Sequence, residues 1–201
     1  ALIAKIAKAR YADEFRKEWG PAIFDRPEAA LEAVAASIAA FERTRAFQPF
    51  TSKFDHVMRG EARFTEQELR GLGLFTNSQK GNCAQCHSVD AGSRDPKKSL
   101  FTDFSYDSLG VPRNAGIAAN RDPLFFDLGL CGPVRGDLSS RTDLCGRFKV
   151  PSLRNVALRQ RFFHNGRFDS LAEVLRFYAT RDTRPSRWYP GPVYDDLPAA
   201  L

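Results

Sequence analysis

Residue types that carry special chemistry are scarce in this chain of 201 residues, which has one Met, two Trp, three His and four Cys. No run of 18 apolar residues exists, which excludes a membrane-spanning helix. The longest apolar-rich stretch, Ala29 to Phe41, is interrupted by Glu32 and is typical of an amphipathic helix. The N-terminus also lacks an initiator Met and the features of a secretory signal peptide. We therefore expect a mature or trimmed chain that starts partway through a larger protein.

Charge is distributed unevenly along the chain. The net charge is +6, and between Arg141 and Pro190 eleven Arg and Lys residues face four Asp and Glu residues, so the remainder is close to neutral. A basic surface of this kind attracts nucleic acid, an acidic protein or an anionic cofactor, or only keeps a protein soluble. Apolar residues make up 43% of the chain and charged residues 27%, which indicates a folded globular domain.

Helices are expected in the first half of the chain. Ala1 to Glu18 has helical spacing and ends at Gly20-Pro21. A second helix begins near Pro27, and the three-to-four spacing of its apolar residues predicts a core-facing stripe of Leu31, Val34, Ile38 and Phe41. The capping box Thr65 to Glu68 predicts a short helix that ends near Leu74-Phe75.

The middle of the chain lacks periodicity. From Gly81 to about Gly146 it is rich in Gly, Ser, Asp, Asn and Pro, and so long an irregular segment is uncommon in a compact domain. Such a segment is reasonable where the chain wraps something other than protein. We expect more ordered chain again at Phe148 to Phe163. A capping box at Ser170 then predicts a helix through Tyr178. Thr183 to Leu201 contains four Pro and is expected to be extended.

The strongest motif is the C-x-x-C-H pentapeptide Cys83-Ala84-Gln85-Cys86-His87. In this pattern two thiols add to the vinyl groups of a haem, and the His that follows is its axial ligand. A zinc site would need a fourth ligand, usually from a second C-x-x-C or H-x-x-H pair, and the sequence has none. A thioredoxin-like motif would need a βαβ setting, which a helical chain does not provide. The sequence therefore predicts one covalently bound haem.

Other polar residues and the remaining cysteines follow from this prediction. Arg113, Arg154 and Asn155 are candidates for contacts with the haem propionates, the alternative for each being a structural or surface role. Covalent haem is assembled in oxidising compartments, where Cys131 and Cys145 would form a disulfide that closes the loop between them. The alternative is a pair of buried free thiols.

The spacing of residues alone does not identify the second axial ligand of the haem iron. Met58, the only Met, and its neighbour His56 precede the motif on a charged segment, which makes both poor candidates. His164 lies at a turn in Phe162-Phe163-His164-Asn165-Gly166 and is either close to the haem or a structural residue. Tyr178 is more typical of a core aromatic, because it continues a helical stripe formed by Leu171, Val174 and Leu175.

Several further stretches, spread over nearly the whole chain, form an ordered series with the haem motif. They are Ile38 to Thr44, Ser52 to Asp55, Gly71 to Phe75, Gly81 to His87, Phe101 to Phe104, Leu109 to Arg113, Phe148 to Ala157 and Phe163 to Gly166. In this order the series resembles the C-terminal haem domain of the bacterial di-haem cytochrome c peroxidase family, and within it the MauG-like branch.

The resemblance implies an all-α fold: a cytochrome c-like helical domain with long irregular loops that wrap a covalent haem. Residues 61–201 would form this domain, and residues 1–60 a helical segment linked to an N-terminal haem domain. The family's C-terminal haem transfers electrons between a peroxide-reactive haem in the N-terminal domain and a donor, which is a small cytochrome or a protein substrate. The resemblance also implies a periplasmic setting. The first haem motif is absent from this chain, so we expect no catalytic residue within it.

The resemblance also implies roles for individual residues. His87 would be the proximal iron ligand, and Tyr178 takes the position of the distal ligand, where MauG-like proteins use a Tyr. The family binds calcium partly through backbone carbonyls, which here belong to Arg159 and Arg161, and two cations beside a calcium ion are unfavourable. A stand-alone mono-haem electron carrier without catalysis is the alternative function. A nucleic-acid module is disfavoured, because the basic stretch contains no recognisable binding motif.

Overall fold

The computed structural model describes residues 1–133, 136–191 and 196–198. The chain divides into two compact units, Ala1–Ser52 and Lys53–Leu201, and each has its own hydrophobic core. Within the described ranges, no helix combines the length and the apolar character that crossing a bilayer requires.

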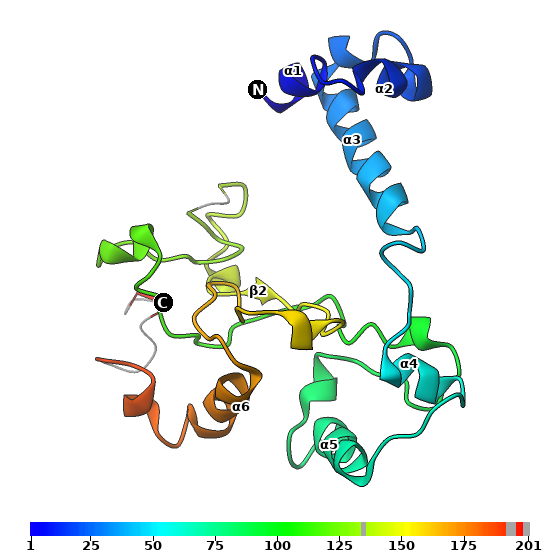
Figure 1. Cartoon of the computed structure of the whole chain (residues 1–201). Helices are drawn as coiled ribbons and strands as arrows, with labels where there is room; N and C mark the ends of the chain where they lie inside the picture. Colours follow the sequence, from blue (N-terminus) through cyan, green and yellow to red (C-terminus); the bar gives the residue numbers. More distant parts are fainter. Residues whose placement is uncertain (134–135, 192–195, 199–201) are drawn as a thin grey trace. The chain divides into compact units, whose positions relative to one another are not determined.

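The first unit is built from the helices α1 (Leu2–Ile6), α2 (Ala12–Trp19) and α3 (Pro27–Glu42), as Figure 1 shows. The sequence predicts one helix over residues 1–18, but the chain turns between α1 and α2. Backbone bonds three residues apart, from Lys8 N to Lys5 O and from Ala9 N to Ile6 O, close the end of α1. The turn has a packing reason, because it allows residues of both short helices to reach one core that includes Ile3, Phe15, Ile23, Ala30 and Ala33.

The helix α3 has a different buried face from the predicted stripe. Leu31, Ile38 and Phe41 are 52%, 54% and 57% exposed, whereas Ala30 and Ala33 are buried. The prediction of an apolar stripe was therefore wrong for this unit. Small alanine side chains let α1 and the 3₁₀ turn Ile23–Asp25 approach the helix closely, which the larger residues of the stripe would prevent.

The second unit contains the helices α4 (Lys53–Met58), α5 (Glu66–Thr76) and α6 (Leu171–Thr180). It also contains an antiparallel pair, β1 (Tyr106–Asp107) with β2 (Phe148–Lys149), in the register Tyr106 opposite Lys149. The regular structure of the unit is therefore mainly helical, with one short strand pair, rather than all-α.

Capping explains where the two longer helices begin. Thr65 Oγ1 accepts a hydrogen bond from Glu68 N at 3.2 Å, and the Glu68 carboxylate accepts one from Thr65 N at 2.7 Å. This confirms the capping box at the start of α5. Ser170 Oγ accepts a hydrogen bond from Glu173 N at the start of α6. Both helices run about as far as the sequence predicts.

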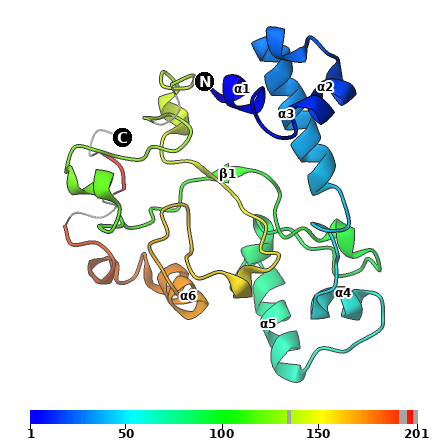
Figure 2. The ribbon, with the colours of Figure 1, turned by 45° about the horizontal axis from the view of Figure 1, so that its top comes forward.

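Most of the chain between α5 and α6 is irregular, as Figures 1 and 2 show. A disulfide joins Cys131 to Cys145, and Gly129 forms isolated β-bridges with Cys145 and Arg147, which together fasten the middle of this segment. The described 3₁₀ turns in the segment are Cys83–Gln85, Pro96–Lys98, Ala118–Arg121, Thr142–Leu144 and Val156–Leu158.

The core of the second unit is aromatic and lies against one side of α6. Its buried members are Val111, Phe162, Phe168, Phe177, Trp188 and Tyr189. From α6 the core takes Phe177, which is fully buried, whereas Leu175 and Tyr178 are 62% and 46% exposed. The spacing argument for Tyr178 as a core aromatic is therefore wrong, because the adjacent residue fills that role.

The helix α4 is fastened to the second unit by a buried ion pair. The Asp55 carboxylate is 1% exposed and accepts a hydrogen bond from Arg154 Nη1 at 2.6 Å. The guanidinium of Arg154 also donates to the carbonyl oxygens of Pro96 and Ser99. Residues 53–60, which the sequence assigns to the N-terminal segment, therefore belong to the second compact unit.

Candidate functional site

The C-x-x-C-H motif lies on a tight turn directly after α5. Asn82 adopts a left-handed conformation with φ of 49°, Cys83–Gln85 forms a 3₁₀ turn, and His87 N donates to Cys83 O at 2.9 Å. Gly81 is required here, because a Cβ atom at this position would lie 2.5 Å from the carbonyl oxygen of Leu74 in α5. Local backbone geometry thus places both cysteines and the histidine on one short turn.

The thiols of Cys83 and Cys86 are both free and half-buried. Burial raises the pKa of the Cys83 thiol. Burial, followed by the negative charges of Asp107 and Asp103, raises the pKa of the Cys86 thiol. Both residues are therefore thiols rather than thiolates at neutral pH, which is the form that adds a sulfur and a hydrogen across a vinyl group.

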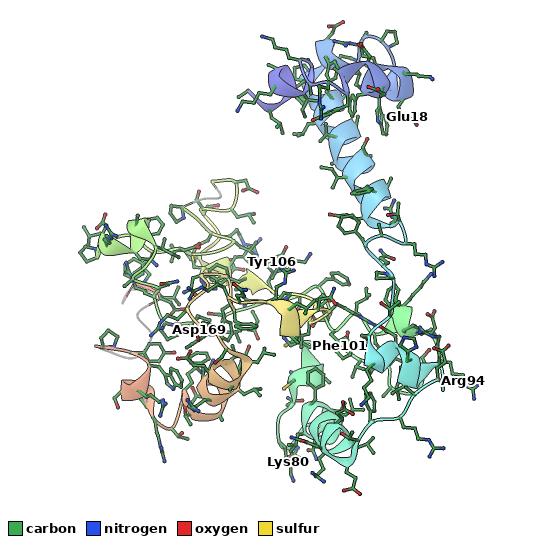
Figure 3. The ribbon with its side chains drawn as sticks, viewed as in Figure 1. Glu18, Lys80, Arg94, Phe101, Tyr106 and Asp169 are labelled. Atoms are coloured by element: carbon green, nitrogen blue, oxygen red, sulfur yellow. A yellow bond between two sulfur atoms is a disulfide. The ribbon has the colours of Figure 1, made fainter. Side chains whose placement is uncertain are left out.

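The imidazole of His87 is held by a backbone carbonyl. Its Nδ1 atom lies 2.9 Å from the oxygen of Phe101, a residue with a positive φ of 54° that is labelled in Figure 3. A carbonyl can only accept, so we assign the proton to Nδ1, which leaves the lone pair on Nε2 for a metal. A second hydrogen bond of this kind fixes the tautomer and orientation of metal-binding histidines.

Tyr178 on α6 is electrostatically coupled to the C-x-x-C-H turn. Its pKa is raised to about 12, first by burial and then by the negative charge that Cys83 would carry when ionised, with smaller effects from Cys86 and Asp107 and an opposing effect from Arg181. Solvent still reaches the ring, which is 46% exposed. The raised pKa keeps the phenol protonated at neutral pH, whereas the exposure to solvent limits how far burial can raise it.

The hydroxyl of Tyr178 has no hydrogen-bond partner within residues 1–133, 136–191 and 196–198, although its ring contacts Phe163 and Phe177 at centroid distances of 5.6 and 5.9 Å. By contrast, the hydroxyl of the buried Tyr189 donates to Gly110 O. A buried tyrosine usually places its hydroxyl on an acceptor, as Tyr189 does, whereas Tyr178 is 46% exposed. The oxygen of Tyr178 is thus available as a ligand.

The other residues considered as distal ligands are engaged elsewhere. His164 stacks on Phe148 with a centroid distance of 3.4 Å and an interplanar angle of 6°. Burial lowers the pKa of His164, against an opposing effect of Asp127. His56 Nδ1 lies 2.7 Å from the carboxylate of Glu61, and Met58 ends α4.

The three residues predicted to contact propionates have protein contacts or lie exposed. The guanidinium of Arg113 donates to the backbone oxygens of Asn120 and Asp122, and that of Arg154 forms the ion pair described above. Asn155 is exposed and starts a 3₁₀ turn with φ of 58°. The two arginines are therefore positioned without a propionate, and the propionate contacts stay predictions.

The donor set fits a covalently bound haem. The turn supplies two thiols and one imidazole nitrogen, and Tyr178 supplies an oxygen. Apolar side chains are also exposed on both helices that flank the donors, with Leu74 of α5 at 50% and Leu175 of α6 at 62%. A flat apolar group would cover such side chains. Among the described residues, no group of three or more His, Cys, Asp and Glu side chains could hold a metal ion. The calcium site at the backbone carbonyls of Arg159 and Arg161 stays a prediction.

No protein-family model matches the chain. The methylamine utilization protein MauG of Paracoccus denitrificans is 36% identical over 174 residues, which cover 84% of this chain and 42% of MauG. The crystal structure of the diheme peroxidase BthA from Burkholderia thailandensis superposes with a TM-score of 0.87 at 39% identity, covering 99% of this chain and 49% of BthA. The chain belongs to the di-haem peroxidase and MauG-like family.

Further relatives in this family are peroxidases by name. Cytochrome c551 peroxidase of Nitrosomonas europaea is 28% identical over 169 residues, which cover 83% of this chain and 41% of that enzyme. This member of the di-haem peroxidase and MauG-like family therefore spans less than half the length of the relatives it matches.

The sequence did not indicate two residues that build the site. The carbonyl of Phe101 orients His87, and Phe163, with φ of 63°, contacts Tyr178 through its ring. Positive φ values at phenylalanine have no sequence signature, because this conformation is unfavourable for a bulky side chain and depends on tertiary packing.

Proposed function

We propose that this chain is the electron-transfer haem c domain of a di-haem peroxidase or MauG-like oxidoreductase. One haem would be attached to Cys83 and Cys86, with His87 as the proximal and Tyr178 as the distal iron ligand. The observation that carries the proposal is the geometry of the C-x-x-C-H turn, which presents two free thiols and a His87 imidazole whose Nδ1 is held by Phe101 O. Tyr178 is the candidate for the distal position because its hydroxyl has no hydrogen-bond partner among the described residues. When bound, the haem would supply one-electron oxidation and reduction.

Different residues of the chain would have different roles in binding a haem. Cys83 and Cys86 would anchor it, and the hydrogen bond from His87 Nδ1 to Phe101 O keeps the Nε2 lone pair aimed in one direction. Tyr178 holds its proton at neutral pH in the protein environment alone, since its pKa is about 12. Ligation would therefore require Tyr178 Oη to release that proton, and the resulting phenolate would bring one negative charge to the site.

The role within a whole protein follows from the incomplete coverage of the relatives. A peroxide-reactive haem would lie in an N-terminal domain, and this chain would pass electrons to it from a small cytochrome or from a protein substrate. The setting would be periplasmic, as the disulfide between Cys131 and Cys145 favours. A mono-haem carrier without catalysis is the alternative, because the chain has a single C-x-x-C-H motif. A second such motif upstream in the gene would support the enzyme.

The attachment and the ligand can be tested separately. The denatured, acid-washed polypeptide should keep its Soret absorbance, and a colourless polypeptide would exclude covalent haem. We then expect Tyr178→Phe to convert the ferric haem to a high-spin or water-ligated form, and Tyr178→Met to give a His/Met spectrum with a higher reduction potential. Tyr106→Phe is the matched control, because Tyr106 is 40% exposed and should leave the spectrum unchanged. An unchanged spectrum in Tyr178→Phe would rule out Tyr178 as the ligand.

A further inference from the structure

The basic stretch of the sequence forms an arginine-rich part of the surface around the aromatic core of the second unit. It contains no lysine between residues 154 and 191. We call five exposed arginines of this stretch the arginine surface, and none of the five has an ion-pair partner among the residues that the structure describes. They are Arg161, Arg167, Arg176, Arg184 and Arg187.

Contacts through the core bring members of the arginine surface together. The guanidinium of Arg167 lies 5.5 Å from the ring centroid of Phe168, and that of Arg187 lies 5.3 Å from the ring of Trp188. The rings of Phe168 and Trp188 are themselves 5.6 Å apart. Two arginines from different elements are therefore held over neighbouring rings.

The other three arginines are attached to the same elements. The side chain of Arg161 lies beside Gly166, which precedes Arg167. Arg184 N donates to Thr180 O at the end of α6, and Arg187 N donates to Arg184 O. Arg176 lies on α6 itself. A sixth arginine, Arg181, forms an ion pair with Asp182. The five residues of the arginine surface have no such partner among the described residues.

The arginine surface adjoins the proposed haem site. Tyr178 contacts Phe177 at 5.9 Å between ring centroids, and Phe177 contacts Trp188 at 5.4 Å, beneath Arg187. A protein bound at these arginines would therefore be separated from Tyr178 by two aromatic rings. Guanidinium groups bind carboxylates in pairs of parallel hydrogen bonds, and complementary charge guides such partners to the surface.

We infer that the arginine surface docks an acidic protein that exchanges electrons with this chain. The exchange of electrons rests on the proposed function, whereas the docking itself depends only on charge and geometry. An acidic protein is favoured over a nucleic acid because the surface adjoins the site that would exchange electrons.

The experiment measures the dissociation constants of the haem-bound chain with two probes, an acidic small c-type cytochrome and a basic cytochrome c. We expect the acidic probe alone to bind, and Arg184→Glu/Arg187→Glu to weaken its binding roughly tenfold or more. Raising the ionic strength from about 0.01 M to about 0.1 M should weaken it further, since the Debye length falls from about 30 to about 10 Å. The control Lys97→Glu/Lys98→Glu changes the net charge equally at exposed residues of another 3₁₀ turn.

Several outcomes would overturn the inference. Equal loss in the control would show that net charge, not the arginine surface, governs binding. Equal binding of both cytochromes, or binding of a DNA duplex in place of the acidic probe, would exclude an acidic-protein surface. Should the Arg184/Arg187 variant lose its native circular dichroism, Arg167→Glu/Arg176→Glu provides a second pair. The haem spectrum is recorded for every variant, so that failure of docking with an intact spectrum leaves the proposed function standing.

Discussion

The buried ion pair between Asp55 and Arg154 allows a prediction with a defined magnitude. Asp55 is 1% exposed and lies 2.6 Å from Arg154 Nη1, while Arg154 also donates to Ser99 O and Pro96 O at 2.7 to 3.0 Å. We expect Arg154→Met to lower the free energy of unfolding by about 3–5 kcal/mol, because it leaves a carboxylate buried without its cation. The 20% exposure of the Arg154 side chain admits some water and favours the lower end of this range.

Urea denaturation of the haem-bound protein, followed by circular dichroism, measures this loss from the shift in midpoint at constant slope. The double variant Asp55→Asn/Arg154→Met should lose less stability than the two single variants added together, because the two residues act as one unit. The same series separates a structural from a propionate role for Arg154. A loss below about 1 kcal/mol, the range typical of exposed pairs, together with a changed reduction potential would refute the structural account.

Two further predictions concern the disulfide and His164. The double variant Cys131→Ser/Cys145→Ser should lose about 2–4 kcal/mol of unfolding free energy in the same urea assay, because the bond closes a loop between residues 14 apart in sequence; an unchanged midpoint would show that it constrains little. The ring of His164 should titrate below pH 6.5 by NMR in the ferrous protein, and Asp127→Asn should lower its midpoint further. Since its folded pKa is depressed, His164 should contribute stability above its unfolded pKa that is lost as the pH falls, and a midpoint above 6.5 would contradict this.

Features that depend on residues close in sequence were predictable. The capping box at Thr65 and the cap at Ser170 need only a side chain and a backbone amide three residues later. The C-x-x-C-H turn is similarly local, and the fold around it agrees with the family resemblance. The prediction of irregular chain between α5 and α6 also follows from composition, because Gly, Pro, Asp and Asn favour turns over regular structure.

Burial was harder to predict than helix position. On α6 the residues Phe177 and Tyr178 are adjacent, so a helical rotation of about 100° decides which one enters the core. Periodicity favoured Tyr178, because Leu171 and Leu175 lie on its side of the helix, but these residues are exposed in the structure. An apolar stripe indicates a covered face without identifying what covers it, and here a bound group is a better candidate than protein.

Polar pairs between residues far apart in the chain could not be predicted from the sequence. Asp55 and Arg154 are 99 residues apart, and nothing in the residues around either one indicates the other. Their pairing gives Arg154, for which the sequence predicts a propionate contact, a role in attaching α4.

The scarcity of methionine and the placement of Tyr178 have a joint consequence for the proposed electron transfer. The only methionine, Met58, ends α4, a helix attached through Asp55 to Arg154. Cys83 and Cys86, when ionised, would raise the pKa of Tyr178, which is the residue that we propose as the distal ligand. A phenolate stabilises ferric iron where a thioether raises the reduction potential. A domain ligated by Tyr178 would therefore release an electron readily to a stronger oxidant, which is the direction of transfer that supplying a peroxide-reactive haem requires.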